Sequence, residues 1–581
     1  MVLGGAAVTP ASAAKVTFEL TDEPGSWFRN TAGGGSLAVA TPGTEVVFTG
    51  KSNTVHTRTS LIFPTGATNM PFDTAPRKGS DSVVLHTPGL YVFTCKIHPY
   101  MFGAVIIDNP ATTGLDLGET ISLVNGITVP TSSDLATRLL RTFFIATNPA
   151  NWKDYSSAAP WHVTYPSVDV RITGGAVANL DAVLSARYGN DTAKDELFNP
   201  ATAAVGEIWV DTQFEKTGGK SKPGTATAVS GQTWQPTRKV ALPQINMNNP
   251  HNMWTDKNQN LIYQTQWFDS KLTVFNRTTG QFVNNISVGE SPAHVMTQVG
   301  SDKLHVTLNG STDHKSVVEL SANAGGILRK IDIGEGNPHA HWMSHNGELM
   351  VTPNPFDNNS TKYTFTNDTK VLVPTGALPI ATGMTPDSTK AYVANLLDSS
   401  ITVIDTQTNT VLKTINLIAN YHPITGAVTG PVGALPIQTP VSPNGTNMVT
   451  ANTLTGTITI VNPVTDEVVA MLPCDPGCHG VQYGAKQGGG YYAYVSSKFS
   501  NSLIIVDPDP NNDGNPADAT IAGRILLTAV GTTATDDAIT SNRGMGGQGI
   551  LTIPVVYNGW VQNLPQVWKD QLTSAQRNPI Q

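Results

Sequence analysis

The residues best suited to chemistry gather first in one short segment, Cys95-Lys96-Ile97-His98-Pro99-Tyr100-Met101. A separate histidine, His56, lies upstream at the end of an earlier apolar run. Two imidazoles, one thiolate and one thioether are the donor set of a trigonal copper site with a weak axial methionine. The sulfur donors favour Cu(I) and the imidazoles suit both oxidation states, so such a site transfers electrons without binding a substrate. The sequence therefore predicts a mononuclear copper site here.

The alternative is that Cys95 is a small buried apolar residue and His98 a loop residue. The spacing, the upstream histidine and the flanking strand patterns together favour the metal site. The segment TCKIHPYM, with two residues between histidine and methionine, resembles the cupredoxins, and its short loop is similar to that of amicyanin in particular. The resemblance covers the N-terminal region and implies that His56, Cys95, His98 and Met101 bind a type 1 copper ion. His86 lies outside the motif.

A second set of histidines recurs in loops that close successive repeats later in the chain. Aligned on the apolar residue that begins the next strand, these loops read His251-Asn252-Met253, His294-Val295-Met296, His341-Trp342-Met343, Thr382-Gly383-Met384, Thr439-Pro440-Val441, His479-Gly480-Val481 and Gln548-Gly549-Ile550. Four of these seven positions are histidine, although the chain has only 13 histidines. Equivalent positions of a closed array of repeats form a ring, so the four imidazoles are expected to converge. We predict that His251, His294, His341 and His479 form a second copper site.

Further histidines near this ring have two interpretations. His339, two residues before His341, and His162 in APWHVTYP could add ligands, and His345 is a weaker candidate. Each of these histidines could instead be a polar residue whose hydrogen bonds are satisfied within the fold.

Two other pairs of residues lie near the ring positions. Glu290 and Glu335 each stand in a Gly-Glu loop and could act as catalytic proton carriers, although solvated loop carboxylates are the simpler interpretation. Cys474 and Cys478 lie in CDPGC. An exported protein favours a disulfide between them, and a thiol ligand beside His479 is the alternative.

The elements that must position these groups are mostly β-strands, and the predicted fold class is all-β. Val, Ile and Thr recur in short runs, glycine and proline are abundant, and only 13% of the residues are charged, which favours strands joined by tight turns. Residues 15–110 alternate apolar and polar residues and predict a Greek-key β-sandwich. Residues 111–205 predict a connector that is partly helical, with helices near 132–147 and 176–188.

The chain repeats itself over residues 206–565. Each unit has a strand such as Ala391-Tyr392-Val393, a second strand such as SITVID, a turn such as TQTNT and a Gly/Pro loop. Units of about 40 to 50 residues with several short strands are typical of propeller blades. Seven units begin near Gly206, Lys257, Asp302, Gly347, Ser388, Gly445 and Gly488. A parallel β-helix is the alternative, although its repeats are shorter, and residues 566–581 would form a tail.

Two resemblances follow from the repeat. The segments VIDTQTNTVLKTI and VNPVTDEVVAML resemble the YVTN family of bacterial seven-bladed propellers. A histidine-lined propeller joined to a cupredoxin resembles nitrous oxide reductase, and the propeller alone is similar to thiocyanate dehydrogenase. In nitrous oxide reductase the cupredoxin follows the propeller and has two cysteines, whereas here it comes first and has Cys95 alone. The ring also offers fewer histidines, so a cluster of two or three coppers fits better.

These resemblances imply a copper-dependent oxidoreductase that acts on a small inorganic substrate in the propeller channel. Electrons would pass through the type 1 copper to or from an external redox carrier such as a cytochrome c or a cupredoxin. Thiocyanate-like oxidation and reduction of nitrous oxide or nitrite are both open, with a slight preference for oxidation. The alternative is a non-enzymatic copper-binding or electron-transfer protein whose propeller is a docking platform.

Charge and hydropathy exclude other classes of function. The net charge is −8 and no run of basic residues occurs, which argues against nucleic acid as a partner. No apolar stretch approaches the length of a membrane span. Ala11-Ser12-Ala13 fits the small-residue rule for signal-peptide cleavage, so residues 1–14 predict a signal-peptide remnant or a flexible start, and a periplasmic or otherwise exported protein. A homo-oligomer is compatible with the sequence.

Overall fold

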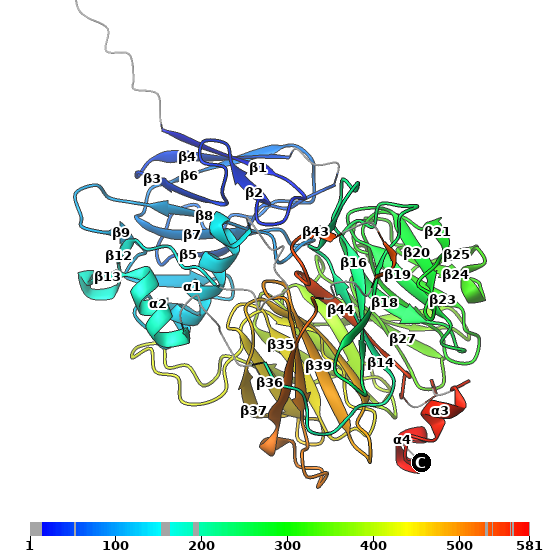
Figure 1. The fold of residues 1–581 in the computed structure, drawn as a ribbon. Coiled ribbons are helices and arrows are strands. Elements are labelled where there is room, and N and C mark those ends of the chain that lie inside the picture. The colour runs from blue at the N-terminus through cyan, green and yellow to red at the C-terminus, as the bar shows by residue number, and fades with distance from the viewer. Residues whose placement is uncertain are drawn as a thin grey trace, which may run out of the picture. The chain divides into compact units, whose positions relative to one another are not determined.

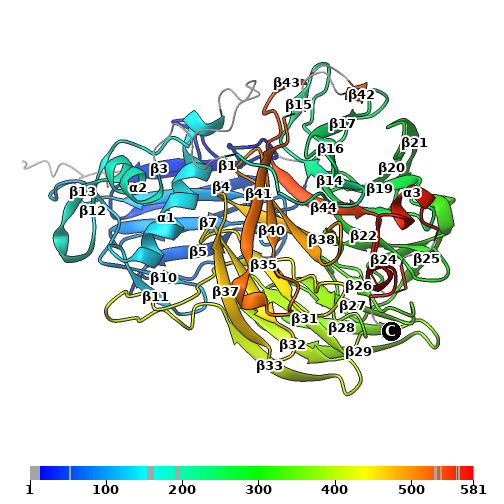
Figure 2. The same cartoon turned by 60° about the horizontal axis from the view of Figure 1, so that its bottom comes forward.

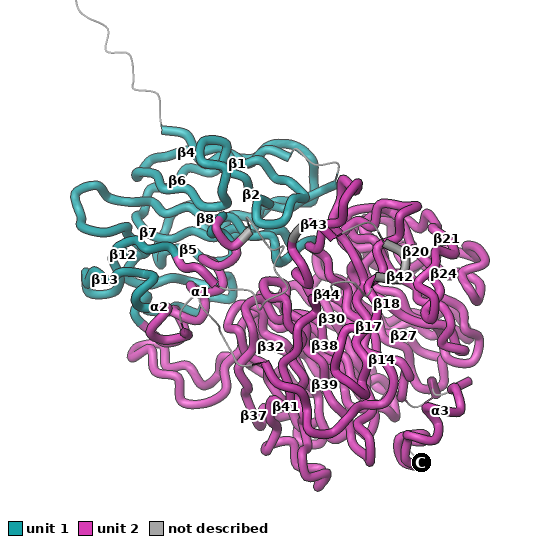
Figure 3. The backbone as a smooth tube through the Cα atoms, in the orientation of Figure 1, with its two compact units in different colours: residues 1–132, 147–149, 166–183 teal, residues 133–146, 150–165, 184–581 magenta. Residues whose placement is uncertain are grey.

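A computed structural model describes residues 14–50, 54–152, 163–189, 197–528, 533–536, 539–557, 559–560 and 563–579. Within these ranges the protein is built mainly from β-strands, which confirms the all-β prediction. The chain forms two compact units, made of residues 1–132, 147–149 and 166–183 and of residues 133–146, 150–165 and 184–581 (Figure 3). None of the described helices is long and apolar enough to cross a membrane.

The first unit is a sandwich of two sheets (Figure 1). In order across the first sheet, the strands are β2 (Phe28–Asn30), β1 (Lys15–Leu20), β4 (Thr44–Gly50) and β6 (Ser80–Leu85). In order across the second, they are β11 (Thr128–Pro130), β10 (Thr120–Leu123), β5 (Thr59–Pro64), β7 (Gly89–Thr94), β8 (Phe102–Ile107) and β3 (Leu37–Ala40). Phe48 of β4 and Phe93 of β7 meet between the sheets, with ring centroids 4.9 Å apart. Apolar side chains on the inner faces of both sheets thus form the core.

The pairing of β7 with β8 positions the predicted copper segment. The two strands pair in an antiparallel register from Gly89 opposite Ile107 to Thr94 opposite Phe102. All residues of both strands are buried. The ladder therefore fixes both ends of the loop from Cys95 to Met101.

The second unit is the predicted seven-bladed propeller (Figure 2). Among the described residues, six blades are antiparallel sheets of four consecutive strands. The first three are β18 (Pro250–Thr255), β19 (Leu261–Gln266), β20 (Lys271–Asn276) and β21 (Phe282–Ser287); β22 (Pro292–Thr297), β23 (Leu304–Leu308), β24 (Val317–Leu320) and β25 (Ile327–Ile331); and β26 (Trp342–Met343), β27 (Leu349–Asn354), β28 (Asn359–Thr364) and β29 (Thr369–Pro374). The next three are β30 (Pro379–Met384), β31 (Lys390–Asn395), β32 (Ser400–Asp405) and β33 (Thr410–Asn416); β34 (Pro436–Ile437), β35 (Met448–Asn452), β36 (Thr457–Asn462) and β37 (Glu467–Pro473); and β38 (Cys478–Ala485), β39 (Tyr491–Ser497), β40 (Ser502–Asp507) and β41 (Thr520–Leu526).

The seventh blade joins the two ends of the repeat region. It contains β14 (Glu207–Thr212), β16 (Thr225–Ser230) and β17 (Pro236–Ala241), and is completed by β44 (Gly547–Ile553) from near the C-terminus. β44 pairs antiparallel with β14, so the last inner strand closes the ring. β42 (Thr533–Asp536) pairs parallel with β17 at the outer edge.

The remaining elements are short. Helices α1 (Asp134–Thr147) and α2 (Leu180–Tyr188) lie where the sequence predicted helices, and the Ser133 hydroxyl accepts a hydrogen bond from the Ala136 N–H (3.1 Å) at the start of α1. The other elements are β9 (Leu115–Asp116), β12 (Asp169–Arg171), β13 (Val177–Asn179), β15 (Lys216–Thr217), β43 (Ile539–Ser541), α3 (Gln566–Lys569), α4 (Ser574–Arg577) and the 3-10 turns Pro149–Trp152, Thr173–Gly175, Ala322–Ala324 and Pro516–Asp518.

Candidate metal centres

The loop between β7 and β8 brings Cys95 and His98 against His56. Sγ of Cys95 lies 3.6 Å from Nδ1 of His98, and the rings of His56 and His98 have centroids 5.1 Å apart. All three side chains are fully buried. One ligand atom from each lies within 4.8 Å of the other two, so this triad can hold a metal ion. Met101 is also buried, and its N–H donates to the His98 carbonyl (2.9 Å), which closes the loop.

The triad favours a cysteine thiolate. Burial by itself raises the pKa of Cys95, but hydrogen bonds and positive charge from His56 and His98 outweigh it, and the pKa falls well below the usual range. The Thr57 N–H also donates to Sγ of Cys95 (3.3 Å). A thiolate is the form of cysteine that binds metal ions. The donor set and its charge therefore fit a copper ion.

The other side of His56 faces a carboxylate. Oδ1 of Asp22 lies 3.5 Å from Nε2 of His56 and accepts a hydrogen bond from the Thr54 hydroxyl (2.8 Å). Burial by itself lowers the pKa of His56, but Asp22 and Cys95 raise it to about 9. Because Nε2 is turned to Asp22 and Thr54, Nδ1 is the nitrogen left for the side of Cys95.

A second triad lies in the propeller and consists of His251, His294 and His339. One ring nitrogen from each lies within 4.8 Å of the other two, and all three side chains are buried. The ring centroids of His251 and His294 are 5.4 Å apart, and that of His339 lies 5.1 Å from His251 and 5.3 Å from His294. This triad can also hold a metal ion.

Two histidines of this triad have strongly lowered pKa values. Burial, followed by the charges of neighbouring histidines, keeps the pKa of His251 and of His294 well below the usual range. Nε2 of each is buried without a hydrogen-bond partner in the described part of the chain. Neutral imidazoles keep the lone pair that a metal ion requires, and imidazole suits copper as well as zinc, iron and nickel.

Hydrogen bonds orient two of these rings. Nδ1 of His339 donates to the Ile380 carbonyl (2.6 Å), which leaves Nε2 as the ligand atom. Nδ1 of His251 contacts the Gln548 amide, which comes from the strand that closes the ring. The Thr307 hydroxyl accepts from the His294 N–H (3.0 Å) and donates to the His339 carbonyl (2.5 Å), so it links the two ligand-bearing segments.

The structure places the four predicted ring histidines at different distances from this triad. His479 lies nearby, with its ring centroid 6.4 Å from that of His251. His341 is buried but outside the triad, and its place there is taken by His339. The strand register explains the difference: Trp342 pairs with Val351 as Trp254 pairs with Tyr263, so His339, and not His341, stands at the position that matches His251. His162 lies outside the described residues.

The structure does not support the roles predicted for the two carboxylates or the disulfide predicted for the two cysteines. Glu290 is exposed and Glu335 is half-buried, and neither carboxylate makes a hydrogen bond or ion pair to another described residue. Cys474 and Cys478 are buried free thiols, so the expected disulfide is not present. Sγ of Cys478 lies 3.5 Å from the carbonyl oxygens of Asn452 and Thr457.

Two buried ionisable residues near the triad were not predicted. Lys498 and Asp211 are both fully buried. Burial raises the pKa of Asp211 well above its usual range, against the effects of Gln264 and Lys498, and lowers that of Lys498 well below, against the effect of Asp211. Asp211 follows the apolar run Ile208-Trp209-Val210 and Lys498 ends the segment YYAYVSSK, and this pattern of an ionisable residue at the end of a strand could have singled out both.

Comparisons with known proteins add little to this picture. No family model and no curated protein matches the chain. Hydrazine synthase from Kuenenia stuttgartiensis superposes with a TM-score of 0.41 and 15% identity, over 48% of this chain and 88% of that chain. A functionally unknown protein from Desulfotomaculum acetoxidans superposes with a TM-score of 0.42 and 15% identity, over 59% of this chain and 98% of that chain. Likenesses of this strength carry no information on ligand or activity.

Proposed function

We propose that this chain is an exported copper-dependent oxidoreductase that acts on a small inorganic substrate. One buried triad has a cysteine and two histidines, and the other has three histidines. Their presence in one chain is the observation that carries the proposal, because the first donor set suits one-electron transfer and the second suits a copper site for ligand binding. An exported, periplasmic location accords with the Ala11-Ser12-Ala13 signal.

The proposed sites differ in their ligands. His56, Cys95 and His98, with Met101 as the axial donor, would hold a type 1 copper ion. His251, His294 and His339, with His479 beside them, would hold a cluster of two or three coppers. When bound, copper in the propeller supplies Lewis acidity and electron exchange.

The chain's own residues would handle protons. Burial favours the protonated form of Asp211, which can hold a proton on its carboxyl group. Oδ2 of Asp211 lies beside Gly549, the neighbour of the Gln548 that contacts His251. Asp211 is therefore better placed than Glu290 or Glu335 to give or accept a proton near the triad.

The reaction would be thiocyanate dehydrogenase-like oxidation or nitrous oxide reductase-like reduction, with an external cytochrome c or cupredoxin as redox partner. Purified protein loaded with copper should turn over thiocyanate, nitrite or nitrous oxide with such a carrier. His294→Ala should abolish turnover and keep the intense visible band of a copper thiolate, and Cys95→Ser should abolish that band. His314→Ala, on an exposed loop, is the matched control and should change neither.

The same experiment tests the non-enzymatic alternative. An enzyme should retain a fixed copper content in the presence of a mild chelator. A wild-type protein that shows no turnover and releases its copper to the chelator would support a carrier or store instead.

A further inference from the structure

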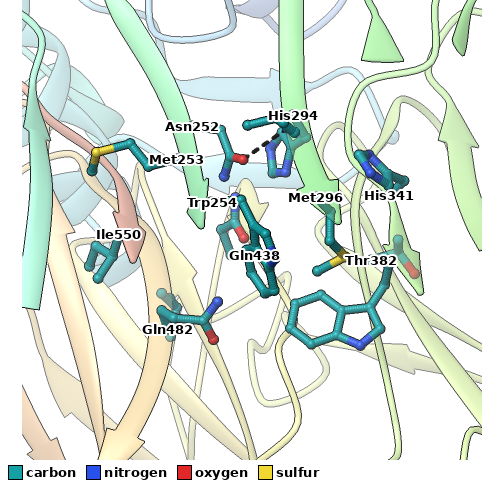
Figure 4. A pocket seen from close by; sticks show the side chains of 13 residues that line it. Asn252, Met253, Trp254, His294, Met296, His341, Thr382, Gln438, Gln482 and Ile550 are labelled. Atoms are coloured by element: carbon teal, nitrogen blue, oxygen red, sulfur yellow. Dashed lines mark hydrogen bonds between the residues drawn. The ribbon is translucent and has the colours of Figure 1, made fainter. Parts of the chain in front are cut away.

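A cavity lies beside the imidazole triad, and inner-strand residues of all seven blades line it (Figure 4). His294 belongs both to this lining and to the triad. The other lining residues are neutral amides, a hydroxyl, a second histidine and apolar or aromatic side chains. None of the lining residues is Asp, Glu, Lys or Arg.

Two amides present only donors to the cavity. Oδ1 of Asn252 accepts a hydrogen bond from the Val295 N–H (3.1 Å). Oε1 of Gln482 accepts from the Tyr483 N–H (3.0 Å) and the Tyr557 hydroxyl (2.6 Å). A backbone N–H can only donate, so these contacts fix which end of each amide is oxygen. The NH₂ groups of Asn252 and Gln482 are therefore left to face the cavity. Figure 4 shows the Gln482 nitrogen turned toward the middle of the cavity.

Two further polar side chains reach the lining without a partner. His341 is 2% exposed and Thr382 is 4% exposed. Both ring nitrogens of His341 and the hydroxyl of Thr382 are buried with no hydrogen-bond partner in the described part of the chain. Buried polar groups of this kind lower stability unless something in the cavity pairs with them.

The walls between these donors are apolar and polarisable. Trp254, Trp342 and Met296 are among these lining residues. The NH₂ groups of Asn252 and Gln482, with no carboxylate in the lining, suit a ligand that accepts hydrogen bonds. The lining has no cationic side chain to offset the hydration energy of a strongly hydrated ion, so a ligand that loses little hydration energy on entry is favoured. A weakly hydrated monovalent anion meets both conditions, whereas a divalent or strongly hydrated anion loses far more hydration energy.

We propose that the cavity binds a small, weakly hydrated monovalent inorganic anion through the amides of Asn252 and Gln482 and the hydroxyl of Thr382. The proposal rests on the proposed function for one consequence only: an anion held next to His294 would make the substrate an anion rather than a neutral gas. Binding itself requires no copper, so the cavity can be tested separately.

Iodide is a suitable probe because it scatters anomalously and quenches tryptophan fluorescence. Crystals of the copper-free full chain soaked in iodide should show an anomalous peak among Asn252, Thr382 and Gln482. In solution, iodide should quench Trp254 and Trp342 with saturation. Bromide and thiocyanate should compete with it, and fluoride and sulfate should not.

Thr382→Val removes one donor with little change of shape and should weaken iodide binding about fivefold to tenfold. Gln482→Glu keeps the acceptor oxygen for Tyr483 and Tyr557 but replaces the NH₂ group, and should abolish the peak. Thr439→Val is the matched control, because the Thr439 hydroxyl donates to the Tyr392 carbonyl (2.8 Å) and does not line the cavity. It should leave iodide affinity within about twofold.

A cavity that holds only water, with no iodide peak and linear quenching, would overturn the proposal. So would sulfate competing as well as thiocyanate, or Thr439→Val weakening iodide as much as Thr382→Val. Copper loading of the wild type, measured separately, distinguishes the two proposals. Iodide binding without propeller copper would refute the copper enzyme alone, and propeller copper without iodide binding would refute the anion site alone.

Discussion

Nε2 of His56 lies 3.5 Å from Oδ1 of Asp22, so a proposed copper ligand of the sandwich lies against a carboxylate that is only 8% exposed. A nearby negative charge favours the more positive, oxidised metal. Asp22→Asn should therefore raise the reduction potential by on the order of 50 mV, equivalent to about 1 kcal/mol. A redox titration that follows the visible band would measure this potential. Glu19→Gln is the control, because Glu19 pairs with the exposed Arg29 instead. An unchanged or lower potential in Asp22→Asn, with an intact spectrum, would contradict the account.

The triad makes a prediction that differs from the simple alignment of the repeats. His339→Ala should lose propeller copper, because its Nε2 is held toward the site by the bond from Nδ1 to Ile380. His341→Ala should keep that copper, since His341 lies outside the triad. Copper per chain in the two variants decides between them. Equal losses, or a loss confined to His341→Ala, would show that the ligands are wrongly assigned.

Gly549 is required where the inner strands approach the site. A Cβ there would lie 2.5 Å from the His251 carbonyl oxygen and 2.8 Å from Cα of Asn252. Because backbone atoms cannot move aside cheaply, Gly549→Ala should reduce the free energy of unfolding by about 1–3 kcal/mol and displace His251. Urea unfolding and copper content test both effects. Gly79→Ala, where a Cβ meets nothing within 4 Å, should be nearly neutral.

The copper-free protein should lose stability as the pH falls below about 6.5. Burial, with a smaller effect of His305, lowers the pKa of His341 to about 3. The His341 imidazole is therefore protonated at a higher pH in the unfolded chain than in the folded chain. As the pH falls from 6.5 toward the folded pKa, each buried histidine of this kind lowers the free energy of unfolding by up to about 1.4 kcal/mol per pH unit. The contribution vanishes above pH 6.5.

Urea unfolding of wild type and His341→Gln at several pH values would measure this slope. The free energy of unfolding of His341→Gln should depend less steeply on pH, by the amount that one bound proton contributes. His314→Gln, on an exposed loop, should have the same pH dependence as the wild type. Identical slopes in His341→Gln and the wild type would mean that His341 is not a buried neutral residue.

Much of the fold could be predicted from the sequence, because strand alternation and repeat length are local properties. Strands such as Ser400–Asp405 and Thr457–Asn462 carry the repeated pattern directly. The repeat alignment includes Gln548-Gly549-Ile550, but the pairing of Gly547–Ile553 with Glu207–Thr212 is a long-range contact that no local pattern predicts.

The candidate site was harder to predict. The pairing of Trp254 with Tyr263 and of Trp342 with Val351 places His339 at the position that matches His251. Asn-Pro precedes both His251 and His339 in the sequence, but the alignment used the apolar residue that starts the inner strand and so favoured His341. Asp211 and Lys498 could not be placed beside the triad because their partners, Gln264 and Gln213, are far from them in the sequence.

The most direct test is an anomalous difference map collected at the copper edge from crystals of the copper-loaded full chain. The account predicts one peak among His56, Cys95 and His98, and at least one more among His251, His294 and His339. A single peak in the sandwich, with none at the propeller histidines, would contradict it.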